Sequence, residues 1–273
     1  MSDTKNSVLP DIIEPMSNAI QQNIPETAKQ ADGALSTVVG FFNNVVLYPV
    51  KKANLTFRYK MESFEDDLKK KIKNIPEENL QVPPVKITGP VLEALRYAYD
   101  EDELREMYEE MLASAMDNRK VKQVHRSYVD AVRQMEPLDA QVLCRINNYN
   151  QITAVHVKMY LAESQQEYYI DAMPYHYNAL LCDLGDPFQI SASISNLLRL
   201  GLLISTLGIL SEGVAEQIEK EEYIQKRFEL FSQQQGGARI AVSGDCDIIS
   251  LDSYGRNFVD VCISKKEIEN NGN

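Results

Sequence analysis

The stretch ISASISNLLRLGL, residues 190–202, is the clearest guide to the fold of the C-terminal part of the chain. Its apolar residues Ile194, Leu197 and Leu198 recur at helical spacing and predict a helix over 190–200 with one buried face. Gly201 follows, and glycine readily adopts the left-handed conformation that ends many helices. The apolar residues 202–204 then predict a short strand.

A charged helical segment, a β-hairpin and a final helix are expected after this strand. The sequence Ser243-Gly244-Asp245 is typical of a turn between two strands. The expected elements are a helical segment at 212–235, strands at 239–242 and 247–251, and a closing helix around Phe258, Val259 and Cys262. Helix, turn, helix and hairpin in this order form the outline of a winged helix.

The N-terminal half of the chain predicts a series of helices. Phe57, Phe64 and Leu68 share one face of a long amphipathic helix expected at 51–74. Pro83-Pro84 predicts an extended connector, and Gly89-Pro90 predicts a new helix with Pro90 at its first position. Further helices are expected at about 102–116, 125–135 and 137–146, and strands at 152–157 and 168–171.

The expected fold is therefore mainly α: a multi-helix N-terminal region and a C-terminal winged-helix-like module with a small β-hairpin. Residues 1–30 carry three prolines among Ser, Asn, Gln and Asp, which predicts a disordered or loosely attached segment. A helical domain is expected at 31–135 and the winged-helix-like domain at 136–273.

The most apolar N-terminal run, residues 34–48, has two interpretations. Its helical spacing and short length favour a buried core helix. Alternatively, Val39, Phe42 and Tyr48 lie on a membrane surface beside the basic residues Lys51 and Lys52.

The charge of the chain disfavours nucleic acid as a partner. The 273 residues carry a formal net charge of −12, which phosphate backbones repel unless basic residues cluster on one face. From residue 181 to the end, eight Lys and Arg residues stand against fourteen Asp and Glu residues, a net charge of −6. Arg199 is the one basic residue of the expected recognition helix, so the winged helix is expected to bind protein rather than DNA.

The cysteines and the hydropathy pattern point to the cytoplasm. Cys144, Cys182, Cys246 and Cys262 fit no zinc spacing, so they are expected to be free, buried thiols in a reducing compartment. No secretory signal opens the chain, and no run of about 18 uncharged apolar residues predicts a spanning helix. Cytoplasmic localisation is expected, with membrane association as the alternative.

No motif predicts catalysis, a metal or a cofactor. His125, His156 and His176 are scattered, and none has the helical partner of a zinc motif. Phosphate-binding glycine loops, dinucleotide fingerprints and nucleophile elbows are absent from the sequence. Acidic pairs such as Asp66-Asp67 are explained by solvation. The chain is therefore not expected to be an enzyme.

An ordered series of residues resembles the abortive infection alpha family over roughly 34–263. The resembling residues are 48–54, Lys60, Phe64, Lys71-Ile72, 75–78, Pro83-Pro84, Gly89-Pro90, 104–108, 112–117, His125, 137–140, 196–202, Gly255, Phe258 and Cys262. The resemblance implies a bacterial or prophage-borne phage-defence protein. It transfers no catalytic residue.

The function expected from this resemblance is phage defence through protein interactions, without catalysis. The alternatives are a membrane-acting effector that uses residues 34–48 and a winged-helix transcriptional regulator; a cryptic nuclease is the least favoured. A phage or host protein is the expected partner, and a homo-oligomer or a membrane surface are further candidates. The candidate interaction residues are Val39, Phe42, Tyr48, Lys51, Lys52, Asn54, Lys60, Arg105, His125, Asp139 and Arg199.

Overall fold

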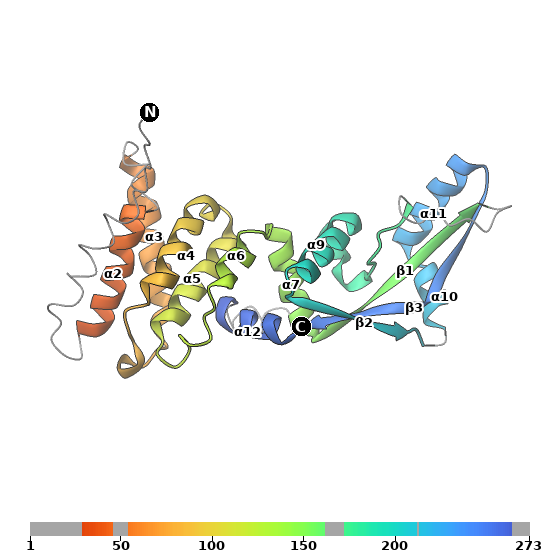
Figure 1. Cartoon of the computed structure of the whole chain (residues 1–273). Helices are drawn as coiled ribbons and strands as arrows, with labels where there is room; N and C mark the ends of the chain where they lie inside the picture. The colour runs from red at the N-terminus through yellow and green to blue at the C-terminus, as the bar shows by residue number, and fades with distance from the viewer. Residues whose placement is uncertain (1–28, 46–53, 162–171, 212, 264–273) are drawn as a thin grey trace, which may run out of the picture.

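The computed structural model describes residues 29–45, 54–161, 172–211 and 213–263 (Figure 1). This part of the chain is mainly helical, with one small antiparallel sheet. Its α-helices are α2 (Lys29–Val45), α3 (Asn54–Ile72), α4 (Val85–Ala98), α5 (Asp102–Met116), α6 (Ser127–Val132), α7 (Pro137–Tyr149), α9 (Pro187–Arg199), α10 (Val214–Glu219), α11 (Glu222–Gln235) and α12 (Ser253–Cys262). Two short 3-10 helices are η2 (Glu77–Asn79) and η3 (Ala179–Leu184).

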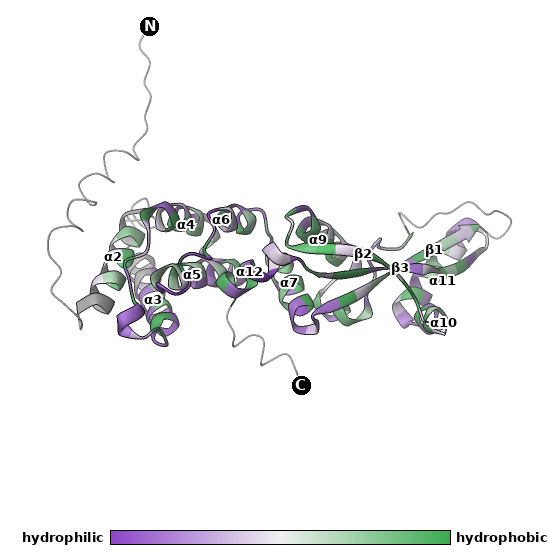
Figure 2. Ribbon diagram, turned by 60° about the horizontal axis from the view of Figure 1, so that its bottom comes forward, coloured by the Kyte–Doolittle hydropathy of each residue, from purple (hydrophilic) through white to green (hydrophobic). Residues whose placement is uncertain are grey.

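The molecule is elongated, with α2 and α3 at one end and the sheet with α10 and α11 at the other (Figure 1). The chain returns at its C-terminal end, where α12 packs against α5 (Figure 2). The Ser114 hydroxyl of α5 donates to the Val261 carbonyl at 3.0 Å, and the Tyr128 and Phe258 rings meet edge to face. The hydrophobic core therefore continues from the helical half into residues near the chain end.

The apolar run of the N-terminal part forms α2 and is a core helix in its described residues. Val38 and Phe42 are fully buried, and the Phe42 ring stacks on Phe64 with centroids 3.9 Å apart. Phe64, Leu68 and Ile72 form the buried face of α3, as their spacing predicts. Tertiary packing of these apolar faces stabilises both helices.

The predicted helix start at Gly89-Pro90 is wrong. Helix α4 begins at Val85, directly after the extended Pro84, and Pro90 lies inside it. The Thr88 hydroxyl donates to the Pro84 carbonyl at 3.2 Å, and the same carbonyl accepts the backbone N–H groups of Ile87 and Thr88. A proline one turn further in removes one backbone N–H, a cost that the buried faces of Val91 and Leu92 offset.

The predicted β-hairpin is also wrong. Residues 238–251 form one continuous strand, β3 (Ala238–Leu251), in the centre of a sheet with order β1-β3-β2. Its neighbours are β1 (Gln151–Leu161) and β2 (Leu203–Ile209), both antiparallel to it. The turn-like residues 243–245 lie opposite the single residue His156 and form a bulge. A winged-helix arrangement is not confirmed by this topology.

Other elements follow their predictions. Helices α5, α7, α9 and α12 lie where spacing placed them, and β1 and β2 extend the short strands expected at 152–157 and 202–204. Gly201 ends α9 with a φ of 71°. Gly255 has a different reason to be glycine, because a Cβ atom there would come within 1.9 Å of the Leu202 carbonyl oxygen.

The structure does not test three of the predictions. Residues 1–28 of the segment expected at 1–30 and the strand expected at 168–171 fall outside the described residues. Residues 29 and 30 are the first two residues of α2. The domain boundary expected at 135/136 stays a prediction.

Candidate functional site

Helix α5 is the central helix of the helical half. Helices α3, α4, α7 and α12 all pack against it. Every residue from Met111 to Met116 is buried, so this part of α5 is enclosed on all sides. Two residues before Met111, Glu109 has only 3% of its surface exposed. The packing of α5 thus places a carboxyl group inside the protein.

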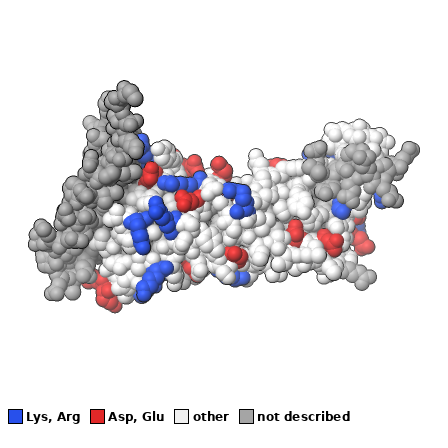
Figure 3. Space-filling view, viewed as in Figure 1, with Lys and Arg blue, Asp and Glu red and all other residues white. Residues whose placement is uncertain are grey.

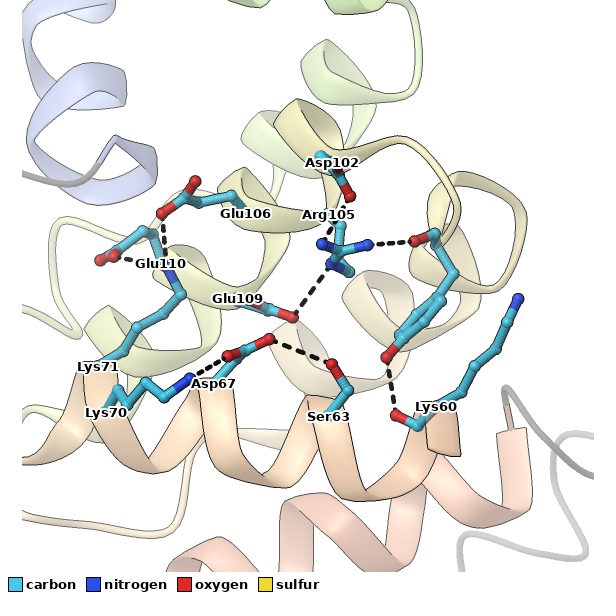
Figure 4. Close-up of polar contacts among 11 residues, drawn as sticks. Lys60, Ser63, Asp67, Lys70, Lys71, Asp102, Arg105, Glu106, Glu109 and Glu110 are labelled. Carbon is cyan, nitrogen blue, oxygen red and sulfur yellow. Dashed lines mark hydrogen bonds and ion pairs between the residues drawn. The ribbon is translucent and has the colours of Figure 1, made fainter. Parts of the chain in front are cut away.

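A cleft of about 540 Å³ lies between α3, α5 and the loop that follows α5. Figure 4 shows the charged side chains that the facing sides of α3 and α5 contribute to it. The cleft is strongly polar because its lining includes eleven ionisable side chains. Those residues are Asp67, Lys70, Lys71, Asp102, Arg105, Glu106, Glu109, Glu110, Asp117, Arg119 and Lys120.

The Lys71 ammonium group connects the two walls of the cleft. Its Nζ atom lies 3.1 Å from a Glu106 oxygen and 2.9 Å from a Glu110 oxygen. Burial lowers the pKa of Lys71, but the Glu110 and Glu106 carboxylates outweigh this effect and raise it overall. One cation is therefore shared between two carboxylates.

Three other cations of the cleft are paired locally. Lys70 contacts Asp67 at 2.8 Å on α3. Arg105 contacts Asp102 at 2.7 Å on α5. Beyond α5, the Arg119 guanidinium forms a hydrogen-bonded pair with the buried Asp117 carboxylate at 2.6 Å, and that bond lowers the pKa of Asp117. Each of these three acids pairs with a cation from the same part of the chain.

Glu109 differs from its neighbours because its Oε1 atom is buried and has no hydrogen-bond partner. The nearest cation is the Arg105 Nε atom, 3.8 Å away, which is beyond hydrogen-bonding distance. Burial raises the pKa of this carboxyl to about 7, against the opposing effect of Lys71. Such a group exchanges its proton near neutral pH and has an unused acceptor.

Tyr99 brings together two of the predicted interaction residues, Lys60 and Arg105. The Tyr99 hydroxyl donates to the Lys60 carbonyl at 2.7 Å, and burial raises the pKa of this hydroxyl to about 12. The Lys60 ammonium lies 4.9 Å from the ring centre and pairs with Asp100 at 2.7 Å. Arg105 lies 5.4 Å from the same ring and donates to the Tyr99 carbonyl. Of the two residues, Arg105 lines the cleft.

Asp139 and Arg199 meet at a second place, the junction between α7 and α9. Asp139 is buried and accepts hydrogen bonds from the Glu136 backbone N–H at 2.9 Å and from the Asn196 amide at 2.8 Å. Arg199 is exposed and donates to Asn196 Oδ1 and Gln134 Oε1. Asp139 completes a capping box at the start of α7. These contacts give both residues a structural role.

The remaining predicted interaction residues are dispersed. His125 is exposed and its Nδ1 atom lies 2.6 Å from the Ser127 hydroxyl. Val39 packs partly buried against the core, and Phe42 is fully buried. Tyr48, Lys51 and Lys52 lie outside the described residues, and Asn54 is described only as the first residue of α3.

Two histidines meet on the sheet. The His156 Nε2 atom lies 3.1 Å from Asp247 Oδ2, and His176 Nε2 lies 3.8 Å from the same oxygen. Burial lowers the pKa of His176. Among the described residues, no group of three or more His, Cys, Asp or Glu side chains could hold a metal ion.

None of the four cysteines, all of which lie among the described residues, forms a disulfide. Cys246 and Cys262 are buried, whereas Cys144 and Cys182 are only partly so. Burial raises the pKa of the Cys262 thiol well above its ordinary value.

Glu109, Lys71, Glu106 and Glu110 are not among the interaction residues that the sequence predicts, because the charged residues of an amphipathic helix usually lie on its exposed face. A usable signal lies in the run MLASAM, residues 111–116, which is apolar or small on every side. Such a run is typical of a central helix, and an acid two residues before it is then expected to be enclosed.

None of the helices in the part of the chain that the structure describes is long and apolar enough to cross a membrane. No curated protein and no solved structure shows a significant match to the chain.

One family profile, described as abortive infection alpha, matches residues 56–262. The match begins after the segment 48–54, which the resemblance had included. It includes all of the cleft and the α7–α9 junction, and it spans well over half of the 273 residues. The chain therefore belongs to the abortive infection alpha family.

Proposed function

We propose that this protein defends a bacterium against phage by binding a phage or host protein in the cytoplasm, without catalysis of its own. Membership of the abortive infection alpha family supports the defence role. The charged cleft between α3 and α5 is the observation that carries the binding role. Its carboxylates and ammonium groups suit recognition of a charged partner surface.

The distribution of charge supports the helical half as the docking side. Figure 3 shows most of the visible Lys and Arg side chains over this half, next to Asp and Glu, whereas the charged side chains visible on the sheet half are few and scattered. Charged residues of both signs around a cleft steer a complementary partner and reject others.

Phage challenge of cells that express variants tests this proposal. The test variant is Lys70→Glu with Lys120→Glu, which reverses two charges on the cleft lining. The matched control is Lys73→Glu with Lys86→Glu, which reverses two exposed charges outside it. We expect the wild type and the control to reduce plaque counts and the test variant to lose most of this protection. Equal protection by the test and control variants, or none by the wild type across a broad phage panel, would contradict the proposal.

The described contacts give less support to the alternatives. The apolar side chains of α2 that a membrane effector needs are buried, Val38 and Phe42 fully. Fractionation of infected cells would revive this role if the protein moved to the membrane.

For a transcriptional regulator, Arg199 already pairs with Asn196 and Gln134. A salt-dependent DNA shift at modest ionic strength would revive that role.

A homo-oligomer is a further part of the proposal, with β2 as its contact. Strand β2 forms one edge of the sheet, and Leu207 and Ile209 on it are 78% and 83% exposed. The other edge, β1, is bridged by Tyr177, whose backbone exchanges two hydrogen bonds with Val155. We propose that β2 pairs antiparallel with β2 of a second copy.

The charge of the chain supports a second copy as the occupant of this edge. Two chains of net charge −12 repel each other, but β2 contains no charged residue, so its edge can meet its own copy without opposing like charges. Sedimentation at micromolar concentration tests the contact. We expect Leu207→Lys to yield monomers, and Leu230→Lys, at an exposed leucine of α11, to leave the dimer intact. A monomeric wild type would contradict this contact.

A further inference from the structure

We propose that the cleft between α3 and α5 binds a primary ammonium or guanidinium group, which Glu109 receives as its hydrogen-bond acceptor. This inference deepens the proposed function, since it names the chemistry that the cleft recognises. The group could be carried by a basic side chain of a partner protein or by a free polyamine-like cation.

The unused acceptor of Glu109 is the first support. A buried carboxyl oxygen without a hydrogen-bond partner costs free energy, and native proteins satisfy most such atoms. The Arg105 guanidinium is close but its hydrogen bonds go to Tyr99, and its shortest ion pair is with Asp102. A ligand that donates N–H groups into the cleft would satisfy Oε1.

The charge balance of the inner cleft is the second support. Glu106, Glu109 and Glu110 are related by i, i+3 and i+4 spacing on α5, which places them on one face, and all three line the cleft. Lys71 is shared between Glu106 and Glu110. Arg105 pairs closely with Asp102 at 2.7 Å and only at 3.8 Å with Glu109, so Glu109 has no cation at hydrogen-bonding distance. A bound cation would neutralise the remaining negative charge, whereas the carboxylates would repel a bound anion.

Binding should depend on pH because the carboxyl of Glu109 must be ionised to hold a cation. Burial holds its pKa at about 7 in the empty cleft, so a cation drives out a proton when it binds below that pH. We therefore expect affinity to rise between pH 6 and pH 8. The other ionisable groups that face Glu109 are Asp67, Lys70 and Lys71 of α3, Arg105 and Glu106 of α5, and Tyr99 at the end of α4.

Calorimetric titration of the full chain tests this proposal with three probes. The first is agmatine, a free guanidinium compound. The second is an acetyl-Gly-Arg-Gly-amide peptide, and the third is the same peptide with neutral citrulline in place of arginine. Each is titrated into the wild type, into Glu109→Gln, and into Glu101→Gln as the control, since Glu101 is exposed and lies outside the cleft lining.

We expect agmatine and the arginine peptide to bind the wild type and Glu101→Gln. We expect affinity to be at least tenfold weaker for Glu109→Gln and for the citrulline peptide. A peptide more than tenfold tighter than agmatine assigns the site to a protein side chain, and the reverse assigns it to a free cation. Absence of binding by both cations, or equal affinity for Glu109→Gln, overturns the proposal.

The pH dependence in the wild type gives a readout that needs no variant. Flat affinity from pH 6 to pH 8 would overturn the role of Glu109 even if Glu109→Gln failed to fold. Failure here is also distinguishable from failure of the proposed function. If the cations do not bind but Lys70→Glu with Lys120→Glu still loses phage protection, the cleft contacts a partner through other chemistry.

Discussion

Two buried acids, Glu109 in the cleft and Asp139 at the α7–α9 junction, have nearly the same exposure and opposite surroundings. Their exposed fractions are 3% and 4%. Asp139 accepts a backbone N–H and the Asn196 amide, so its desolvation is offset by hydrogen bonds. Glu109 leaves one oxygen without a partner. The difference indicates that the hydrogen bonds of Asp139 stabilise the fold. The unpartnered carboxyl of Glu109 destabilises it, and we infer that the cleft retains this carboxyl in order to bind a ligand.

The largest expected effect on the free energy of unfolding is at Asp139, the acid that has hydrogen-bond donors. Asp139→Ala should reduce the free energy of unfolding by about 3 kcal/mol, because it removes one half of the capping box of α7 and one of the two acceptors of the Asn196 amide. Urea unfolding at pH 7 measures the change. A loss below about 1 kcal/mol would mean that Asp139 is no better stabilised than Glu109, and the comparison would fail.

The next effect concerns the pH dependence of stability at Glu109. Its pKa of about 7 in the folded protein lies above the ordinary 4.5, so the folded state holds a proton that the unfolded state has lost. Stability from this group is therefore fully present below pH 4.5 and is lost as the pH rises through 7. We expect the wild type to lose about 2 kcal/mol relative to Glu109→Gln between pH 5 and pH 8.

Urea unfolding at several pH values measures this difference, with Glu101→Gln as the control that should track the wild type. The sharpest form of the comparison adds phage challenge. We expect Glu109→Gln to be at least as stable as the wild type at pH 8 and yet to protect cells less. A variant that is both more stable and fully protective would show that the cleft does not need its carboxylate.

A smaller effect is expected at Asn196, which connects Asp139 to Arg199. Asn196→Ala should cost about 1.5 kcal/mol, because Asp139 keeps its backbone donor but loses the amide. The double variant with Asp139→Ala should cost less than the sum of the single changes, since the two residues share one hydrogen bond. Strict additivity would indicate that the two side chains act separately.

The smallest effect is expected at Arg199. Its side chain is exposed, so Arg199→Ala should change the free energy of unfolding by about 0.5 kcal/mol or less. The same urea titration measures it. A loss above about 1.5 kcal/mol would mean that the exposed Arg199 also stabilises the junction, and the difference between the junction and the cleft would then be larger.

Local sequence predicted the helices well, because their signals lie within a few residues. The spacing of Leu104, Met107 and Met111 predicted α5, and Pro137 marked the start of α7. The errors arose where the deciding contact is distant. The turn-like residues 243–245 sit in one strand because β1, about ninety positions earlier, and β2 hold both sides of β3.

The sequence by itself determined the mainly helical fold, the end of α9 at Gly201 and the family, because periodicity, glycine conformation and an ordered motif series are properties of the chain. Tertiary structure alone decided the cleft. Asp139 is stabilised partly by its own helix start, which a local pattern can indicate. Glu109 is isolated only because α3 packs across α5 and Lys71 is drawn to Glu106 and Glu110. Burial and pairing of charge depend on which surfaces meet, and only the folded chain fixes that.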